Sequence, residues 1–173
     1  MGINLSKIKK EDMEYIYRWF SDAEFLKYYD YYPPVPLTED EVDKIFNDYE
    51  NGKKSEAFAV RLENTIIGVA GYDDIIKENQ VATLFIGLGN ENERGKGYGM
   101  EAMQLLLEHG FTNLNFHRIQ LNVLEFNKRA ISLYEKCGFK MEGIFREFVL
   151  RDGKRYNLLL YGLLKNEWIK KRF

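Results

Sequence analysis

At residues 93–102 the chain reads Glu93-Arg94-Gly95-Lys96-Gly97-Tyr98-Gly99-Met100-Glu101-Ala102. An apolar run at 81–88 precedes this stretch and a segment with helical periodicity at 102–114 follows it, so the pattern predicts a strand, a glycine-rich turn and a helix. Glycines let the backbone approach a ligand closely, and the free amide groups of a helix N-terminus favour an anion. The stretch is therefore either a diphosphate site or a tight connection that holds no ligand.

Two familiar phosphate motifs do not fit this turn. The P-loop requires Ser or Thr after Gly-Lys, but Gly97 follows Lys96. The dinucleotide fingerprint requires a small residue at its sixth position, where Met100 stands. The sequence therefore favours neither of these two nucleotide-binding classes.

Composition excludes several functional classes. The chain has 173 residues, so we expect a single domain over residues 1–173. Its net charge is −2, with charges of both signs spread along the chain, so we expect no nucleic-acid or membrane partner. No signal-like segment opens the chain and no apolar run approaches the roughly 20 residues that span a bilayer, which predicts a cytoplasmic protein. The single Cys137 and two distant histidines predict no disulfide and no metal site.

Periodicity and turn signals predict the remaining elements. Strands are expected at 3–7, 57–62, 65–72, 81–88, 118–124, 139–150 and 155–164. Helices are expected at 11–20, from the capping box at Thr38 to near Gly52, in the segment at 102–114 and between Asn127 and Gly138. Because strands alternate with helices and hairpins occur at both ends, the fold class is mixed α/β.

One stretch, 22–36, is assigned neither to a strand nor to a helix. Four tyrosines lie within its five residues 28–32, and all three prolines of the chain follow at once, so it cannot be a long regular helix. It is either an aromatic lid packed on the core or a segment that faces a substrate.

Two motifs, in the correct order, carry a resemblance to a known family. The first is the Arg94-x-x-Gly97-x-Gly99 turn, and the second is Asn127-Lys128-Arg129-Ala130-Ile131-Ser132-Leu133-Tyr134-Glu135-Lys136-Cys137-Gly138-Phe139. Together they resemble the GNAT superfamily of acyl-CoA N-acyltransferases, and the likeness extends from Ile3 to Trp168. It is greatest to the branch of spermidine and ribosomal-protein N-terminal acetyltransferases, through Gly138-Phe139-Lys140-Met141-Glu142-Gly143, Arg146, Asp152-Gly153-Lys154-Arg155-Tyr156-Asn157 and Leu164-Lys165-Asn166-Glu167-Trp168.

The resemblance implies a twisted mixed sheet of about seven strands with helices on both faces. Its fourth and fifth strands, 81–88 and 118–124, would splay apart around acetyl-CoA, the expected cosubstrate. The pantetheine arm would pair with backbone groups around Phe85, Ile86 and Leu88. The pyrophosphate would lie on the turn formed by Arg94, Gly95, Lys96, Gly97, Tyr98 and Gly99. Asn127 would bond the pantetheine, or would serve only as a helix cap.

Transfer of an acetyl group from a thioester to an amine sets further demands. An alkylammonium of pKa about 10.4 must lose a proton, which costs on the order of 4 to 5 kcal/mol at neutral pH. The leaving thiolate needs a proton, and Tyr134 resembles the general acid of the family, although its spacing also suits core packing.

The base is harder to identify, because no carboxylate lies between Val81 and Gly89, where related enzymes often place one. Ordered water could lead to one of four carboxylates, each of which also fits a solvated surface charge: Asp73, Asp74, Glu78 and Glu147. His109 and His117 are expected to be structural, and Cys137 has no neighbouring His to activate it. We therefore expect direct attack in a ternary complex.

The expected acceptor is a primary amine, either a small amine such as a polyamine or a protein N-terminal amine. The tyrosines at 28–32 and nearby acidic residues would suit a cation: Asp22, Glu24, Asp30, Glu39 and Asp40. The missing carboxylate at 81–89 leaves a second hypothesis, a non-catalytic acyl-CoA-binding or sensing module. A homodimer is expected from the resemblance alone.

Overall fold

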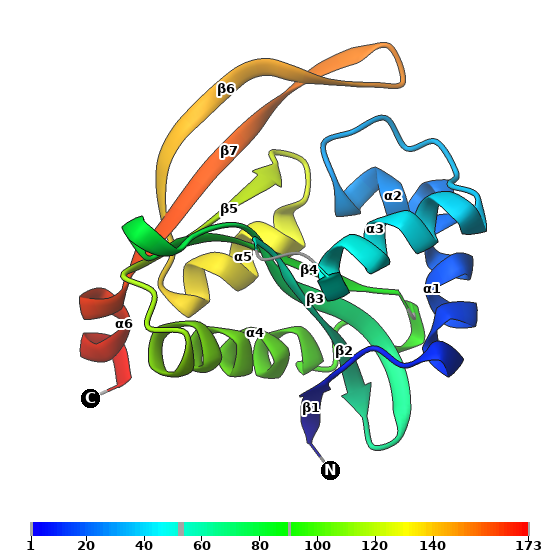
Figure 1. Cartoon of the computed structure of the whole chain (residues 1–173). Coiled ribbons are helices and arrows are strands. Elements are labelled where there is room, and N and C mark those ends of the chain that lie inside the picture. Colours follow the sequence, from blue (N-terminus) through cyan, green and yellow to red (C-terminus); the bar gives the residue numbers. More distant parts are fainter. Residues whose placement is uncertain (1, 52–53, 90, 173) are drawn as a thin grey trace.

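A computed structural model describes residues 2–51, 54–89 and 91–172, with the side chains of 91, 171 and 172 excepted. Its strands are β1 (Ile3–Ser6), β2 (Glu56–Leu62), β3 (Thr65–Ile76), β4 (Val81–Leu88), β5 (Arg118–Leu124), β6 (Lys140–Arg151) and β7 (Lys154–Leu164). They form one seven-stranded sheet in the order β1-β2-β3-β4-β5-β7-β6, in which only the β4–β5 pair is parallel (Figure 1). The predicted mixed α/β sheet is confirmed.

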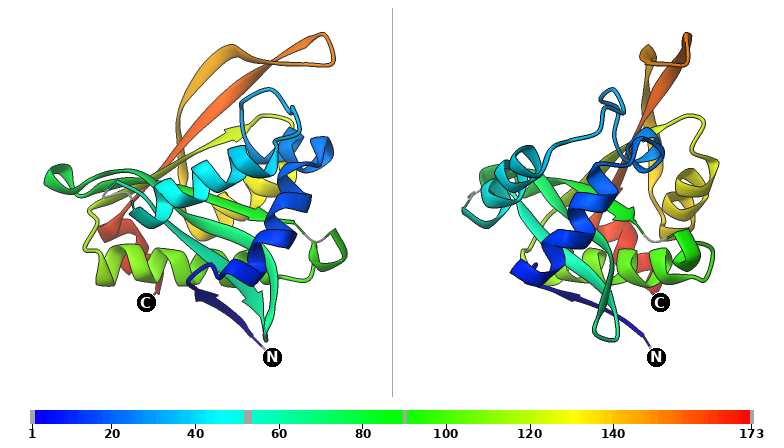
Figure 2. Two further views of the ribbon diagram at one scale, coloured as in Figure 1. Left: turned by 45° about the vertical axis from the view of Figure 1, so that its right-hand side comes forward. Right: turned by 90° about the vertical axis from the view of Figure 1, so that its right-hand side faces the viewer.

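The helices are α1 (Met13–Phe20), α2 (Ala23–Tyr29), α3 (Glu39–Asn51), α4 (Tyr98–Glu108), α5 (Lys128–Cys137) and α6 (Lys165–Arg172). Figure 2 shows α1 and α3 on one face of the sheet and α4 and α5 on the other, as the resemblance implied. The β6–β7 hairpin extends away from the other strands and rises beside α2 (Figures 1 and 2).

The two faces of the sheet carry separate cores, because neighbouring residues of a strand point to opposite sides. In β3, Val69 packs with α1, α2 and α3, whereas Ala70 packs with α4 and α5. The α4 face buries residues such as Met103, Leu106 and Ile119, and a third small cluster lies at the ends of β5 and β7. Each residue of β3 or β4 can thus be assigned to one face.

The stretch 22–36 has no long regular helix, as predicted, but it contains a two-turn helix, α2, that the sequence did not indicate. The side chain of Asp22 caps this helix by accepting a hydrogen bond from the backbone N–H of Glu24 at 2.9 Å. Phe25 and Leu26 are its buried residues. The proline-rich segment after it is irregular, as expected.

Some element ends also differ. The helix after Thr38 is described to Asn51, and its predicted end near Gly52 lies outside the described residues. The helix predicted over 102–114 begins earlier, at Tyr98, and passes after Glu108 into a π-helical turn at His109–Asn113. β3 runs past the predicted end at Tyr72 to Ile76, through a break in register after Asp73.

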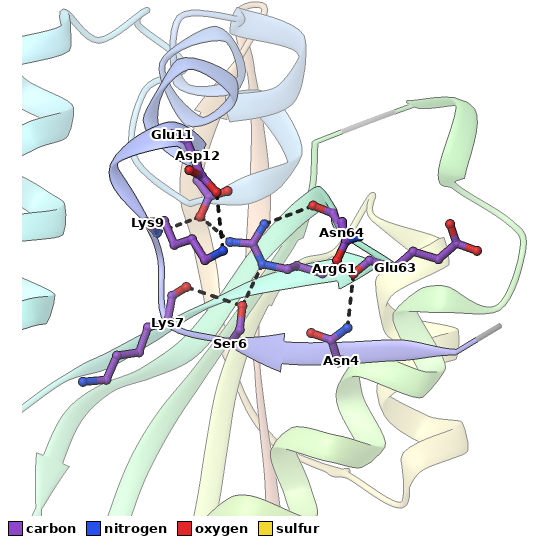
Figure 3. Close-up of polar contacts among 9 residues, drawn as sticks. All are labelled: Asn4, Ser6, Lys7, Lys9, Glu11, Asp12, Arg61, Glu63 and Asn64. Atoms are coloured by element: carbon purple, nitrogen blue, oxygen red, sulfur yellow. Dashed lines mark hydrogen bonds and ion pairs between the residues drawn. The ribbon is translucent and has the colours of Figure 1, made fainter.

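A buried ion pair ties β2 to the turn before α1 (Figure 3). Nη2 of Arg61 lies 2.5 Å from Oδ2 of Asp12, and the two residues are only 7% and 2% exposed. Arg61 also donates from Nε to Ser6 Oγ at 2.8 Å, and the backbone N–H of Lys9 donates to Asp12 at 2.7 Å. These contacts satisfy both charges and fix the start of α1 against the sheet.

Candidate active site

β4 and β5 separate after a short parallel contact. They pair only at Val81–Arg118, Ala82–Ile119 and Thr83–Gln120. Beyond that point β4 continues to Leu88 beside β3, and β5 continues to Leu124 beside β7. Because each strand keeps its outer partner, the two diverge and leave an opening between them. The predicted splay of the fourth and fifth strands is confirmed.

The open part of β4 carries Phe85, Ile86 and Leu88, the residues predicted beside the pantetheine arm. Ile86 and Leu88 pack into the α4-side core, whereas the ring of Phe85 lies 5.2 Å from that of Tyr49 on the other face. Among the described strands, only β3 pairs with this part of β4. The edge that faces β5 can therefore accept an extended chain through its backbone groups.

The glycine turn leads directly into α4. Gly95 and Gly97 have φ angles of 82° and 93°, a left-handed conformation in which a side chain is strained, and Gly97 is the N-cap of α4. No described atom lies within 4 Å of the position that a Cβ would occupy at either residue. Tyr98 and Gly99 form the first turn of α4, where backbone amides have no acceptor within the helix.

Gly99 joins this turn to the rest of the opening. A Cβ at Gly99 would lie 3.6 Å from a methyl group of Leu133 in α5 and 3.8 Å from one of Leu88 in β4. The structure thus brings together the predicted turn, the open part of β4 and the helix that carries Tyr134.

The two cations of the turn are placed differently. Arg94 is half-buried and donates from Nε to the carbonyl oxygen of Leu88 at 3.3 Å, at the end of β4. Lys96 is exposed and forms an ion pair with Glu93 at 3.0 Å. Exposed pairs of this kind contribute roughly 0–1 kcal/mol, so Lys96 can exchange Glu93 for an anion at little cost.

Asn127 caps α5, as one of its two predicted roles requires. Its Oδ1 accepts a hydrogen bond from the backbone N–H of Ala130 at 3.2 Å. Its Nδ2 donates to the carbonyl oxygen of Tyr28 at 3.3 Å, which links the start of α5 to the end of α2. The cap is confirmed, and the role toward pantetheine stays a prediction.

Tyr134 is 8% exposed and lies on α5, with its ring in edge contact with Phe139 at 6.1 Å. Its hydroxyl makes no hydrogen bond to any described residue. Burial raises the pKa of Tyr134 well above its usual value, and the neighbouring Cys137 raises it further. Tyr134 packs in the core and also keeps a protonated hydroxyl, so core packing and proton donation are compatible.

Tyr29 packs against β4 on the face of the sheet that carries α1 and α3. Its ring lies against β4 at Gly87, where a Cβ would come within 2.6 Å of the ring, so glycine is required there. Burial raises the pKa of Tyr29 well above its usual value, and four neighbouring groups raise it further: Tyr49, Asp30, Asp73 and Tyr134. Tyr134 and the two carboxylates therefore all lie close enough to Tyr29 to interact with it electrostatically.

The tyrosine-rich segment packs on the core, as one of its two predicted roles requires, and a role toward a substrate stays a prediction. Arg151 of β6 is 5% exposed, and its Nη2 donates to the carbonyl oxygens of Asp30 and Tyr32 at 3.0 and 2.7 Å. Tyr31 stacks on Tyr32 at 4.8 Å. Arg151 thus ties this segment to the hairpin, and the carboxylate of Asp30 accepts a hydrogen bond from the backbone N–H of Tyr31 at 2.6 Å.

The acidic residues named from the sequence separate into two groups. Asp22, Glu24, Glu39 and Asp40 are exposed, and only Asp30 of that set is half-buried. Among the candidate bases, Asp74, Glu78 and Glu147 are exposed, whereas Asp73 is half-buried and accepts a hydrogen bond from the Tyr49 hydroxyl at 3.2 Å. The structure therefore singles out Asp30 and Asp73.

The other reactive side chains lie outside this arrangement. His109 is half-buried near Glu56, with 3.4 Å between Nε2 and Oε2, and His117 is exposed. Cys137 is buried with its Sγ 3.5 Å from the sulfur of Met100. Within the described ranges, no three His, Cys, Asp or Glu side chains gather as metal ligands would. No helix in the described part of the chain is long and apolar enough to span a bilayer.

Two residues at the site were not identified from the sequence. Tyr49 belongs to the apolar positions of the helix predicted after Thr38, and Arg151 lies between the two strands predicted at 139–150 and 155–164. Their contacts join segments far apart in the chain, so no local pattern indicates them.

The chain matches the acetyltransferase (GNAT) domain family over residues 3–140. A relative from Bacillus licheniformis, the uncharacterized N-acetyltransferase p20, is 30% identical over 169 residues, which are 96% of this chain and 94% of the relative. The chain therefore belongs to the GNAT family of N-acetyltransferases, whose cosubstrate is acetyl-CoA.

Two further similar proteins carry the activities of the spermidine and ribosomal-protein branch. The crystal structure of spermidine N-acetyltransferase from Vibrio cholerae, in complex with CoA and spermine, matches at a TM-score of 0.88 and 24% identity over 96% of this chain and 98% of that one. The [ribosomal protein uS5]-alanine N-acetyltransferase of Escherichia coli is 29% identical over 121 residues, 67% of this chain and 62% of the relative. At 24% identity, the likeness to the Vibrio cholerae structure establishes the fold alone.

Proposed function

We propose that this protein transfers the acetyl group of acetyl-CoA directly to a primary amine in a ternary complex. The observation that carries the proposal is the separation of β4 from β5 beyond Thr83 and Gln120. The glycine turn, Asn127 and Tyr134 border this opening, so one extended cosubstrate can contact all three. In this proposal the turn from Arg94 to Gly99 binds the pyrophosphate, the edge of β4 at 85–88 binds the pantetheine arm, and Asn127 bonds its amides.

Tyr134 is the proposed general acid. Its hydroxyl is free to donate to the sulfur that leaves, because it has no acceptor among the described residues. Its raised pKa keeps the proton on the phenol at neutral pH. Cys137 is buried, with its Sγ 3.5 Å from the sulfur of Met100, and a buried thiol of this kind is unreactive, which supports direct attack over an acetyl-enzyme.

We propose a small cationic amine, such as a polyamine, as the acceptor. The carboxylates of Asp30 and Asp73 and the rings of Tyr29 and Tyr49 gather on the side of β4 away from α4. Carboxylates and aromatic faces both attract an alkylammonium. A protein N-terminal amine is the second candidate, supported by the relative that acts on ribosomal protein uS5.

The test is release of free CoA from acetyl-CoA across a panel of polyamines, monoamines and peptides with free N-termini. We expect diamines and polyamines to give the highest kcat/KM, and peptides to compete only if their N-terminal residue is small. Binding of acetyl-CoA with no CoA release on any amine would instead support a non-catalytic acyl-CoA-binding module.

We also propose a homodimer. β6 lies at the edge of the sheet, and five of its large apolar side chains are about half exposed: Met141, Ile144, Phe145, Phe148 and Leu150. An apolar edge strand of this kind favours pairing with a second copy. The cytoplasmic location stays a prediction from the sequence.

A further inference from the structure

N-acetylation of an alkylammonium requires a proton acceptor, and β4 carries no carboxylate between Val81 and Leu88. The neighbouring strand supplies one. Asp73 of β3 pairs in register with Thr83 of β4, and Thr83 is also the last residue of β4 that pairs with β5. A carboxylate therefore lies one strand away from the point where the opening begins.

The side chain of Asp73 points to the acceptor side of the sheet. Tyr72, the residue before it, is buried in the α4-side core and donates its hydroxyl to the carbonyl oxygen of Leu106. Because neighbours alternate, Asp73 faces the opposite side, where Tyr49 of α3 donates to it at 3.2 Å. Phe85 lies beside the ring of the same Tyr49.

We propose that Asp73 is the catalytic base that takes the proton from the acceptor ammonium, with Tyr49 as the residue that positions its carboxylate. This inference rests on the proposed function, because it assigns a role at the same site. Asp30, which like Asp73 interacts electrostatically with Tyr29, contributes a second negative charge that attracts the ammonium.

The backbone beside Asp73 is shaped to present this side chain. The β3–β4 register breaks between Asp73 and Ile76, and Asp74 adopts a φ of 48°, in the left-handed region. Such bulges redirect side chains and occur often beside active sites. The bulge turns Asp74 into solvent and leaves Asp73 under Tyr49.

The titration of Asp73 supports the role. Burial raises its pKa to about 6, with Asp74 and Asp30 adding to the rise and the Tyr49 hydrogen bond opposing it. The titratable groups that face Asp73 are thus Tyr49 on α3, Asp74 on its own strand, and Tyr29 and Asp30 at the end of α2. A carboxylate of this pKa is ionised at neutral pH and holds a proton better than an exposed one.

Every proton that leaves the acceptor nitrogen or Tyr134 in the reaction has a defined destination. The ammonium gives one proton to Asp73, and the neutral nitrogen attacks the thioester carbonyl carbon. The carbon–sulfur bond then breaks while Tyr134 gives its proton to sulfur, so free CoA leaves as a thiol. The second nitrogen proton returns to the Tyr134 oxygen, and Asp73 releases its proton to water.

The experiment compares Asp73→Asn with wild type in kcat/KM for the best amine of the panel, from pH 5 to 9. Wild type should lose activity below a midpoint near pH 6, since a protonated Asp73 cannot act. Asp73→Asn keeps an acceptor for Tyr49, so it should bind acetyl-CoA normally and be about 10²-fold to 10⁴-fold slower, without that acid limb. Asp73→Glu should restore part of the rate and the limb.

Two controls make the result specific. Asp74→Asn removes a like charge beside Asp73, so the acid limb should move to lower pH with activity retained. Asp48→Asn, on the exposed side of α3, should leave the profile unchanged. If wild type is active and Asp73→Asn keeps the same rate and the same acid limb, Asp73 is not the base. The proposed function is unaffected by that result. A wild type that releases no CoA on any amine overturns the proposed function.

Discussion

The side-chain amide of Asn127 joins two helix ends: its oxygen caps α5 at the N–H of Ala130, and its nitrogen donates to the carbonyl oxygen of Tyr28 at the end of α2. The first contact stabilises a helix, and the second fixes the segment that carries Tyr29 and Asp30. These two functions can be separated by substitution, because Asp preserves the oxygen and removes the donor.

Asn127→Asp should therefore unfold with nearly wild-type free energy, whereas Asn127→Ala should lose about 1 kcal/mol with the cap. If Asn127 also bonds pantetheine, both variants should raise the KM for acetyl-CoA. Urea unfolding and initial rates measure the two quantities. A normal KM in both variants would leave Asn127 with its two structural contacts and no role in binding acetyl-CoA.

Tyr134→Phe should lower kcat by roughly 10²-fold or more, because it removes the proposed proton donor and keeps the ring. The affinity for acetyl-CoA, measured by calorimetry, should not change. Stability should also stay close to wild type, since the hydroxyl has no hydrogen-bond partner among the described residues. Leu133→Met, on the same helix, controls for repacking. Unchanged turnover would contradict the acid role.

The variant Gly97→Ala distinguishes a role of the glycine turn in anion binding from the effect of backbone strain on stability. Its φ of 93° should cost the alanine variant about 1–2 kcal/mol of stability. Gly153 in the β6–β7 turn, with a φ of 75° and equally open surroundings, provides a matched control. We expect similar losses of stability in Gly97→Ala and Gly153→Ala, and a raised KM for acetyl-CoA only in the first. Equal KM values would mean that the turn does not bind the cosubstrate.

The buried pair of Arg61 and Asp12 should dominate the polar contribution to stability at the start of the chain (Figure 3). Asp12→Ala leaves a buried guanidinium without its partner, so we expect a loss of about 3–5 kcal/mol in the free energy of unfolding. Glu14→Ala, which breaks the exposed pair with Arg18, should cost less than about 1 kcal/mol. Chemical denaturation compares the two, and similar losses would contradict the importance of burial.

Ile144→Glu should weaken the proposed homodimer by placing a charge in the exposed apolar stripe of β6. Sedimentation velocity should show a shift toward monomer at micromolar concentration. Arg146→Glu, on the same strand, should change the sedimentation less because it replaces one exposed charge by another. If the wild-type protein is monomeric at all concentrations, the proposed homodimer is wrong.

Much of the fold could be predicted because its signals are local. A continuous apolar run located β4 and alternating apolar residues located β5, both at their observed bounds, and Asp152-Gly153 located the last hairpin. The helix α2 was missed because a neighbouring run of prolines obscured a short pattern, Asp22 followed by Phe25 and Leu26. The predicted turn, Asn127 and Tyr134 lie around one opening because two motifs far apart in the chain border the same pair of strands.

The family, the glycine turn and the helix of Tyr134 could be identified from residue type and spacing within short segments. The candidate carboxylates could be distinguished only by their tertiary contacts. Asp73 and Asp74 are neighbours of identical chemistry, yet pairing with β4, the bulge after Asp73 and the Tyr49 hydroxyl separate them. The direction of a side chain across a sheet depends on register, and register is set by partners that are distant in the sequence.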